Sequence, residues 1–125
     1  MRVNKIGDDG FRALVLSHNL MHLRDLRVDM NKITEAGALQ LSHQCNLPSL
    51  TKLKVRSNEF AENGAQFVAT THALRNLTHL NFNRNGIRDK GVRYIAESTY
   101  MKNLLDLYLD DNELGPEAVF KLSGS

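Results

Sequence analysis

Apolar side chains recur along the chain with two spacings, and these spacings alternate. In four places the order Leu-x-x-Leu-x-apolar makes residues i and i+2 apolar, which puts both on one face of a short strand. These pairs are Leu26 and Val28, Leu53 and Val55, Leu80 and Phe82, and Leu107 and Leu109. Between them, apolar residues three and four apart predict helices. The helical segments follow acidic residues and open near Gly10, Gly37, Gly64 and Gly91.

The alternation repeats with a constant period of 27 residues. One asparagine marks each unit, an apolar residue follows two positions later, and a small residue follows six positions later. The asparagines are Asn4, Asn31, Asn58, Asn85 and Asn112. A strand, a turn, a helix and a return segment thus make one coil. Stacked coils of this kind predict an α/β solenoid.

The unit Leu-x-x-Leu-x-Leu-x-x-Asn-x-Ile-x-x-x-Gly resembles a leucine-rich repeat, closest to the ribonuclease-inhibitor-like subfamily, whose units each carry a full helix. The resemblance covers essentially the whole chain. It implies a horseshoe arc with a parallel β-sheet on the concave face and helices on the convex face. It also implies that the asparagines form an internal ladder, bonding backbone groups of the turn after each strand. Such a ladder is physically reasonable, because buried backbone groups need hydrogen-bond partners.

The 125 residues are expected to form one domain, residues 1–125, with about four full repeats and a partial repeat at each end. Met1 aligns with Val28, so the sequence starts inside a unit, and the last helical pattern starts at Ala118. The stacking surface of an interior unit is apolar, and solenoids usually carry polar capping units. We therefore expect a piece of a longer array, or else end-to-end self-association through uncapped ends.

Composition narrows the class of protein only slightly. The chain is 42% hydrophobic and 24% charged, as expected for a soluble domain, and its net charge of +2 does not favour nucleic acid or membrane surfaces. It has neither an apolar stretch of roughly 20 residues nor a signal peptide. Cys45 is the only cysteine, which excludes an intramolecular disulfide. We expect a cytoplasmic protein, and secretion by a route without a signal stays open.

Chemical motifs are scarce. The sequence has no phosphate-binding glycine loop, no Gly-x-Ser-x-Gly elbow and no Cys-x-x-Cys pair, so no enzyme activity and no cofactor are predicted. His18, Cys45 and His72 share one position of the repeat and have side chains that can ligate a soft metal. They lack an obvious fourth ligand. A structural role is favoured, no metal is predicted, and metal binding by these three residues stays open.

Side chains that alternate with the core residues along the strands should form one extended surface. The predicted partner-binding residues are Asp25, Arg27, Asp29, Met30, Lys52, Lys54, Arg56, His79, Asn81, Asn83, Arg84, Asp106, Tyr108, Asp110 and Asp111. The second strand is cationic and the fourth carries carboxylates around a tyrosine. Mixed charge favours a protein partner, and tyrosine is enriched in interface hot spots. Nucleic acid is disfavoured, because those carboxylates would repel a polyanion and no aromatic platform accompanies the cations.

The sequence therefore predicts a non-catalytic module that recognises a protein through its concave face. Two alternatives stay open. The first is a regulator resembling the leucine-rich Ran GTPase-activating proteins, which would supply Arg84 or Arg56 to a bound nucleotidase. The second is a structural spacer within a larger receptor or a bacterial host-directed protein.

Overall fold

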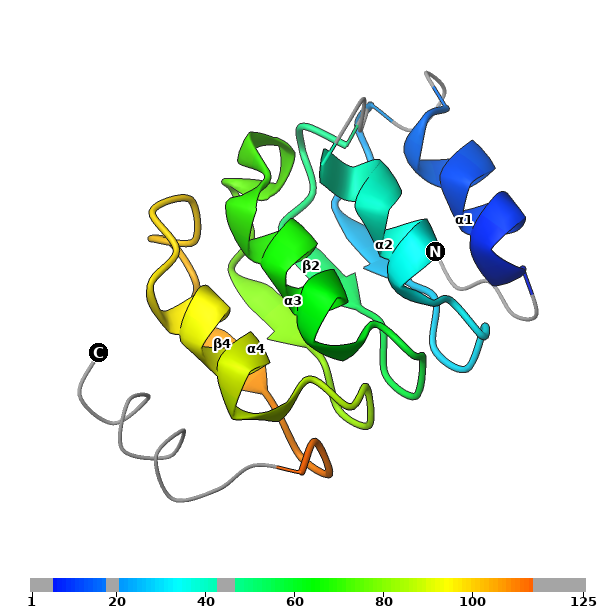
Figure 1. Ribbon diagram of the computed structural model, residues 1–125. Coiled ribbons are helices and arrows are strands. Elements are labelled where there is room, and N and C mark those ends of the chain that lie inside the picture. Colours follow the sequence, from blue (N-terminus) through cyan, green and yellow to red (C-terminus); the bar gives the residue numbers. More distant parts are fainter. Residues whose placement is uncertain (1–5, 18–20, 43–46, 114–125) are drawn as a thin grey trace.

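The computed structural model describes residues 6–17, 21–42 and 47–113. Its α-helices are α1 (Gly7–Val15), α2 (Glu35–Leu39), α3 (Ala61–Thr70) and α4 (Arg88–Ala96). Its strands are β1 (Asp25–Arg27), β2 (Lys52–Lys54), β3 (His79–Asn81) and β4 (Asp106–Tyr108), and two 3-10 helices are η2 (Gln40–Ser42) and η3 (His72–Leu74). Figure 1 shows the helices side by side in one layer and the strands in a second layer behind them.

The four strands form one parallel sheet in the order β1-β2-β3-β4. Leu26 pairs with Leu53, Leu53 with Leu80, and Leu80 with Leu107. Each pair is one repeat apart, so the sheet register equals the sequence period. The predicted α/β solenoid is confirmed, with one coil for each repeat.

The core lies between the strand layer and the helix layer. Leu26, Leu53 and Leu80 are fully buried, as expected for the apolar position in the middle of each strand. In the interior, the rings of Phe11 and Phe60 pack edge to face with centroids 6.2 Å apart, and those of Phe60 and Phe82 at 5.6 Å. This arrangement favours aromatic pairs, so the phenylalanines link successive coils through the core.

The small residue in the first turn of the helix packs closely against the apolar residue four positions before it. A Cβ atom added at Gly64 would come within 2.6 Å of the Phe60 Cβ, and one added at Gly91 within 2.8 Å of the Ile87 Cβ. Real Cβ atoms do not approach so closely. The glycines therefore let the first turn of a helix pack against the apolar residue that precedes it.

Helix starts also join neighbouring coils. Thr34 caps α2, because its hydroxyl oxygen accepts a hydrogen bond from the Ala36 amide at 3.2 Å. The Thr34 amide and hydroxyl donate to the Asp8 carboxylate of the preceding coil at 2.7 and 2.6 Å. No helix in the described part of the chain is long and apolar enough to cross a membrane.

Candidate functional site

The sheet face turned away from the helices, which we call the open face, carries two rows of side chains. Across the sheet, the register aligns the first residues of the strands with one another and the third residues with one another. The first row is Asp25, Lys52, His79 and Asp106, and the second is Arg27, Lys54, Asn81 and Tyr108. Neighbouring strands lie about 4.8 Å apart. The structure thus brings eight of the predicted partner-binding residues together on one surface.

The remaining predicted residues lie in the turns that follow the strands, because each strand is only three residues long. We call this group the rim: Asp29, Met30, Arg56, Asn83, Arg84, Asp110 and Asp111. Met30, Arg84 and Asp111 have φ angles of 56°, 57° and 59°, which are left-handed. This conformation turns the chain out of the strand toward the helix layer. The rim borders the open face at the carboxyl end of the sheet.

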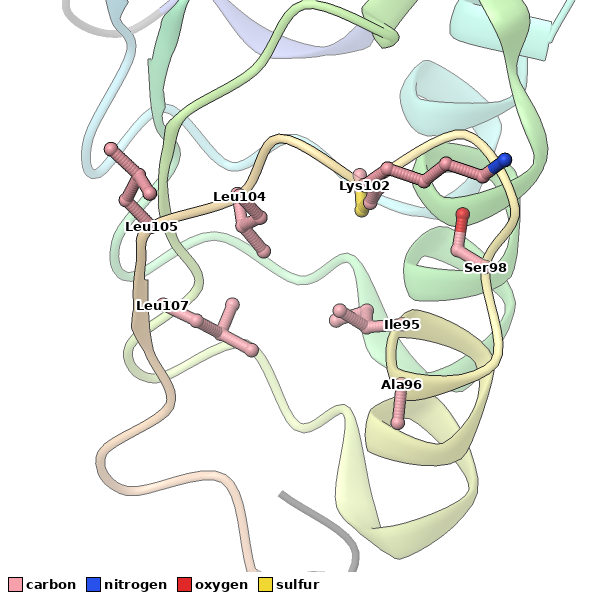
Figure 2. Close-up of a pocket in the computed structure, with 8 residues that line it drawn as sticks. Ile95, Ala96, Ser98, Lys102, Leu104, Leu105 and Leu107 are labelled. Carbon is pink, nitrogen blue, oxygen red and sulfur yellow. The ribbon is translucent and has the colours of Figure 1, made fainter. Parts of the chain in front are cut away.

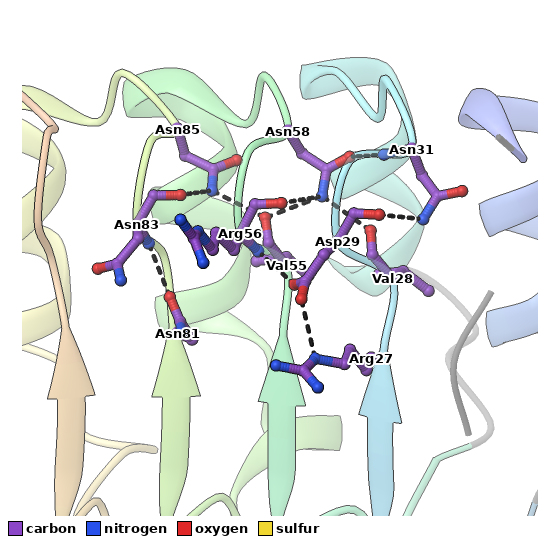
Figure 3. A network of polar contacts seen from close by, with 10 residues as sticks. All are labelled: Arg27, Val28, Asp29, Asn31, Val55, Arg56, Asn58, Asn81, Asn83 and Asn85. Carbon is purple, nitrogen blue, oxygen red and sulfur yellow. Dashed lines mark hydrogen bonds and ion pairs between the residues drawn. The ribbon is translucent and has the colours of Figure 1, made fainter. Parts of the chain in front are cut away.

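Asp29 is not available to a partner, contrary to the prediction from the sequence. Its side chain is 7% exposed. One carboxylate oxygen accepts from the Arg27 Nε at 2.9 Å, and the other accepts from the backbone amide of Arg56, also at 2.9 Å. Asp29 therefore joins the first two described strands of the sheet at their carboxyl ends (Figure 3).

Asn83 occupies the same repeat position two coils later and makes a comparable link. Its Oδ1 accepts a hydrogen bond from the Asp110 amide at 2.8 Å. The Asn83 backbone amide donates to the Asn81 Oδ1 at 2.9 Å. Asn81 and Asn83 are both half-buried, so these amides fix the rim while keeping part of their surface accessible.

Two polar side-chain pairs connect the third and fourth strands. The His79 Nε2 lies 2.7 Å from the Asp106 Oδ2, while the other ring nitrogen lies 2.7 Å from the Thr78 hydroxyl. On the rim, the Arg84 Nε donates to the Asp111 Oδ2 at 3.3 Å, between two side chains that are 59% and 68% exposed. Exposed pairs of this kind contribute about 0–1 kcal/mol to stability.

The cations on and just after β2 differ from these paired side chains. Lys52 and Arg56 are exposed and Lys54 is half-buried. Within the described residues, none of the three forms an ion pair. Most of the acidic groups nearby have other partners: Asp29 holds the Arg27 guanidinium, and Asp106 holds His79. The strand thus presents positive charge that the surrounding surface does not neutralise.

Exposed apolar groups gather at the last described strand. Tyr108 is 49% exposed, and Leu105, just before β4, is 78% exposed. Leu105 was missed in the sequence, although a signal was present: it stands where the two preceding repeats have Thr51 and Thr78. Met30, at the opposite end of the rim, is 62% exposed.

A cavity of about 510 Å³ opens between α4 and β4, with Leu105 on its lining. Figure 2 shows Ile95 and Leu107 pointing into this space from the two layers, while Leu105 points away from the helix. The lining is Ile95, Ala96, Ser98, Met101, Lys102, Leu104, Leu105 and Leu107.

The asparagine of each turn bonds the coil that precedes it. Asn58 donates its side-chain amide to the Val28 and Val55 carbonyls at 2.9 and 2.8 Å. Its Oδ1 accepts from the Asn31 amide at 3.0 Å (Figure 3) and from the Ile33 amide at 3.1 Å. Asn85 and Asn112 repeat this arrangement. The result is a hydrogen-bonded ladder, of which Asn4 lies outside the described residues.

The histidine and cysteine position can be described only in part. His18 and Cys45 lie outside the described residues. His72 is exposed and packs edge to face on Tyr100, with ring centroids 5.7 Å apart. Within the described part of the chain, no three His, Cys, Asp or Glu side chains are grouped so that they could hold a metal ion.

The repeats also match known proteins. The Leucine Rich repeat family matches residues 19–42 and 73–96. Two of the repeats thus match this family, and the fold is that of a leucine-rich-repeat solenoid. Among solved structures, it is similar to the tropomodulin C-terminal domain of Caenorhabditis elegans, with a TM-score of 0.72 and 14% identity over 99% of this chain and 79% of that one. No curated protein matches. At such low identity the likeness shows the fold, and the leucine-rich repeat fold is generally a protein-interaction module.

Proposed function

We propose that this leucine-rich repeat protein is a non-catalytic recognition module that binds a protein partner through the open face and the rim. One observation carries the proposal. The positions that build the coils repeat, whereas the two exposed rows of the open face differ from one coil to the next. A solvated face needs no such variety, but a surface that recognises one partner does.

The charge pattern supports a protein partner over a polyanion. The cations of β2 and the carboxylates of β4 are two strands apart, about 10 Å. A nucleic acid that crossed the sheet over Lys54 would meet Asp106 and Asp110, and like charges brought together oppose binding. A protein surface can match both signs. Tyr108 adds a large, half-exposed ring of the type that anchors interfaces.

The regulator hypothesis receives no comparable support. It requires an arginine that reaches a bound nucleotidase. The Arg84 Nε is bonded to the Asp111 carboxylate of the next coil, and Arg56 lies beside the lysines as part of one cationic row. We also place the chain in the ribonuclease-inhibitor-like subfamily, because α1, α3 and α4 are full helices of 9, 10 and 9 residues.

The test is affinity capture from a lysate of the source cells with wild-type protein and two triple variants. The open-face variant combines Lys54→Ala, Tyr108→Ala and Asp110→Ala. The matched variant makes the same three kinds of change away from the open face: Lys90→Ala, Tyr100→Ala and Asp9→Ala. We expect a protein that wild type and the matched variant retain and the open-face variant loses. Equal retention by both variants would contradict the proposal.

A further inference from the structure

Three cations stand at every second residue along β2 and just after it. Lys52 and Lys54 belong to β2, and the backbone ladder continues to Arg56, whose carbonyl accepts from the Met30 amide; the alternating Leu53 and Val55 are fully buried. Residues two apart in an extended chain are about 6.6 Å apart, so the three backbone positions are evenly spaced. We call this row of three cations the β2 ridge.

The surroundings of the ridge leave its charge available. In the described part of the chain, none of the ion pairs involves Lys52, Lys54 or Arg56. On the rim, Asp29 binds the Arg56 backbone amide and the Arg27 guanidinium, and it is buried. Three cations in a row without an ion pair among the described residues repel one another. An anionic ligand that matched their spacing would relieve this repulsion.

On its other side, the ridge borders a histidine and an asparagine. His79 and Asn81 stand opposite Lys52 and Lys54 in the register, and both are half-buried. The His79 ring nitrogens lie against Asp106 and Thr78, and the Asn81 Oδ1 accepts from the Asn83 backbone amide, so the Asn81 Nδ2 is the group here that can donate a hydrogen bond to a bound segment. One strand further, Asp106 and Asp110 set a limit, because they would repel carboxylates that crossed the sheet. The favourable path for an anionic segment therefore runs along β2 and not across the strands.

We infer that the β2 ridge binds an extended peptide segment of the partner with acidic side chains at every second residue. In an extended chain these side chains lie on one side and recur at about 6.6–6.8 Å, which is the spacing of the ridge. Each carboxylate would meet one cation in a charge-assisted hydrogen bond. This inference rests on the proposed function and specifies the chemistry of the partner.

The probe is a synthetic, end-blocked nine-residue peptide that alternates glutamate with serine, labelled for fluorescence anisotropy at low salt. A second peptide has the same composition with its glutamates in one block, and a third has glutamine in place of glutamate. We expect the alternating peptide to bind at least threefold more tightly than the block peptide and the glutamine peptide not to bind. Affinity should fall as salt is raised, because salt screens exposed charges.

Protein variants locate the site. Lys52→Gln with Lys54→Gln should weaken binding of the alternating peptide by about tenfold, which corresponds to the loss of two solvent-accessible charge pairs. Lys90→Gln, an exposed lysine on α4, is the matched control and should leave the affinity unchanged. Urea unfolding of each variant verifies that it is folded.

Three results would overturn the inference. They are equal affinity for the alternating and block peptides, equal affinity of wild type and the Lys52→Gln, Lys54→Gln variant, and tighter binding of a single-stranded DNA oligonucleotide of the same charge. The last would identify a general polyanion site. If the peptide fails while the open-face triple variant still loses its captured protein, the proposed function stands and only the partner's chemistry is wrong. If the peptide binds but both triple variants capture equally, the proposed function fails by itself.

Discussion

The turn after each strand has the same residue in every described coil, whereas the open face just before it has different residues. Only a few positions separate the two regions. In the turns of the described coils the same residue recurs, so Asn58 and Asn85 make equivalent bonds to the coil before them. On the strand, Lys54 and Tyr108 occupy one repeat position and share no chemistry. The repeating positions hold the coils together, and the variable ones are left to distinguish a partner.

Burial explains the difference. Asn58 is 4% exposed, and its side-chain amide makes buried hydrogen bonds to backbone carbonyls and amides. An apolar residue there would leave buried polar groups without partners. Lys54 and Tyr108 stand in solvent on one side, so a change there removes little from the folded state.

The largest loss of unfolding free energy is expected when a repeating core residue is truncated. Phe60→Ala deletes a fully buried ring that packs on both Phe11 and Phe82. We expect the free energy of unfolding in urea to fall by about 3–5 kcal/mol, because a cavity adds to the lost burial. Tyr108→Ala, an aromatic truncation on the open face, should cost clearly less. Equal losses would show that the open face also holds the fold.

The second change removes one step of the ladder. Asn58→Ala leaves the Val28 and Val55 carbonyls and the Asn31 and Ile33 amides without a side-chain partner. We expect a loss of ~1–3 kcal/mol of unfolding free energy in urea. Asn103→Ala, at an exposed asparagine, is the control and should stay within about 0.5 kcal/mol of wild type. Unchanged stability of the first variant would contradict the role of the ladder.

The third change tests the backbone of the turns. Gly86 has φ 64° and open space around it, so Gly86→Ala adds only conformational strain. We expect it to destabilise the protein by about 1 kcal/mol. Ala61, with φ 58°, offers the reverse substitution, and Ala61→Gly should be neutral or stabilising by a few tenths of a kcal/mol. Thermal unfolding of both variants measures the two signs, and like signs would contradict this interpretation.

The smallest effect is expected on the open face itself. His79 and Asp106 are paired across β3 and β4, but their side chains are 32% and 49% exposed. Asp106→Asn should therefore change the unfolding free energy by about 0.5 kcal/mol or less in urea. A loss as large as that of Asn58→Ala would mean that the surface charges are structural.

Most of the fold follows from the sequence because the period of the repeat equals the register of the sheet. The 27-residue repeat predicts the parallel sheet and its register, since each Leu pairs with the Leu one repeat away. The burial of Asp29 could not be predicted in this way. It depends on the strand ending at Arg27 and on a backbone amide of the next coil, neither of which the hydrophobic pattern encodes.

Two features of the candidate site were within reach of the sequence. His79 and Asp106 are 27 residues apart, so the register places them side by side and makes their ion pair foreseeable. Leu105 breaks a column that holds threonine in the two preceding repeats, which signals an exposed apolar group. Comparing each variable position down its column, in addition to along its strand, would have found both.

The most direct test of the separation between repeating and variable positions is NMR chemical-shift mapping. The isotope-labelled chain would be titrated with the protein identified by affinity capture, and the perturbed amides located on the structure. We predict perturbations concentrated on β1–β4 and the rim, with Lys54 and Tyr108 among the largest, and small changes on the outer surfaces of α1–α4. Perturbations concentrated on those helices would contradict recognition through the open face.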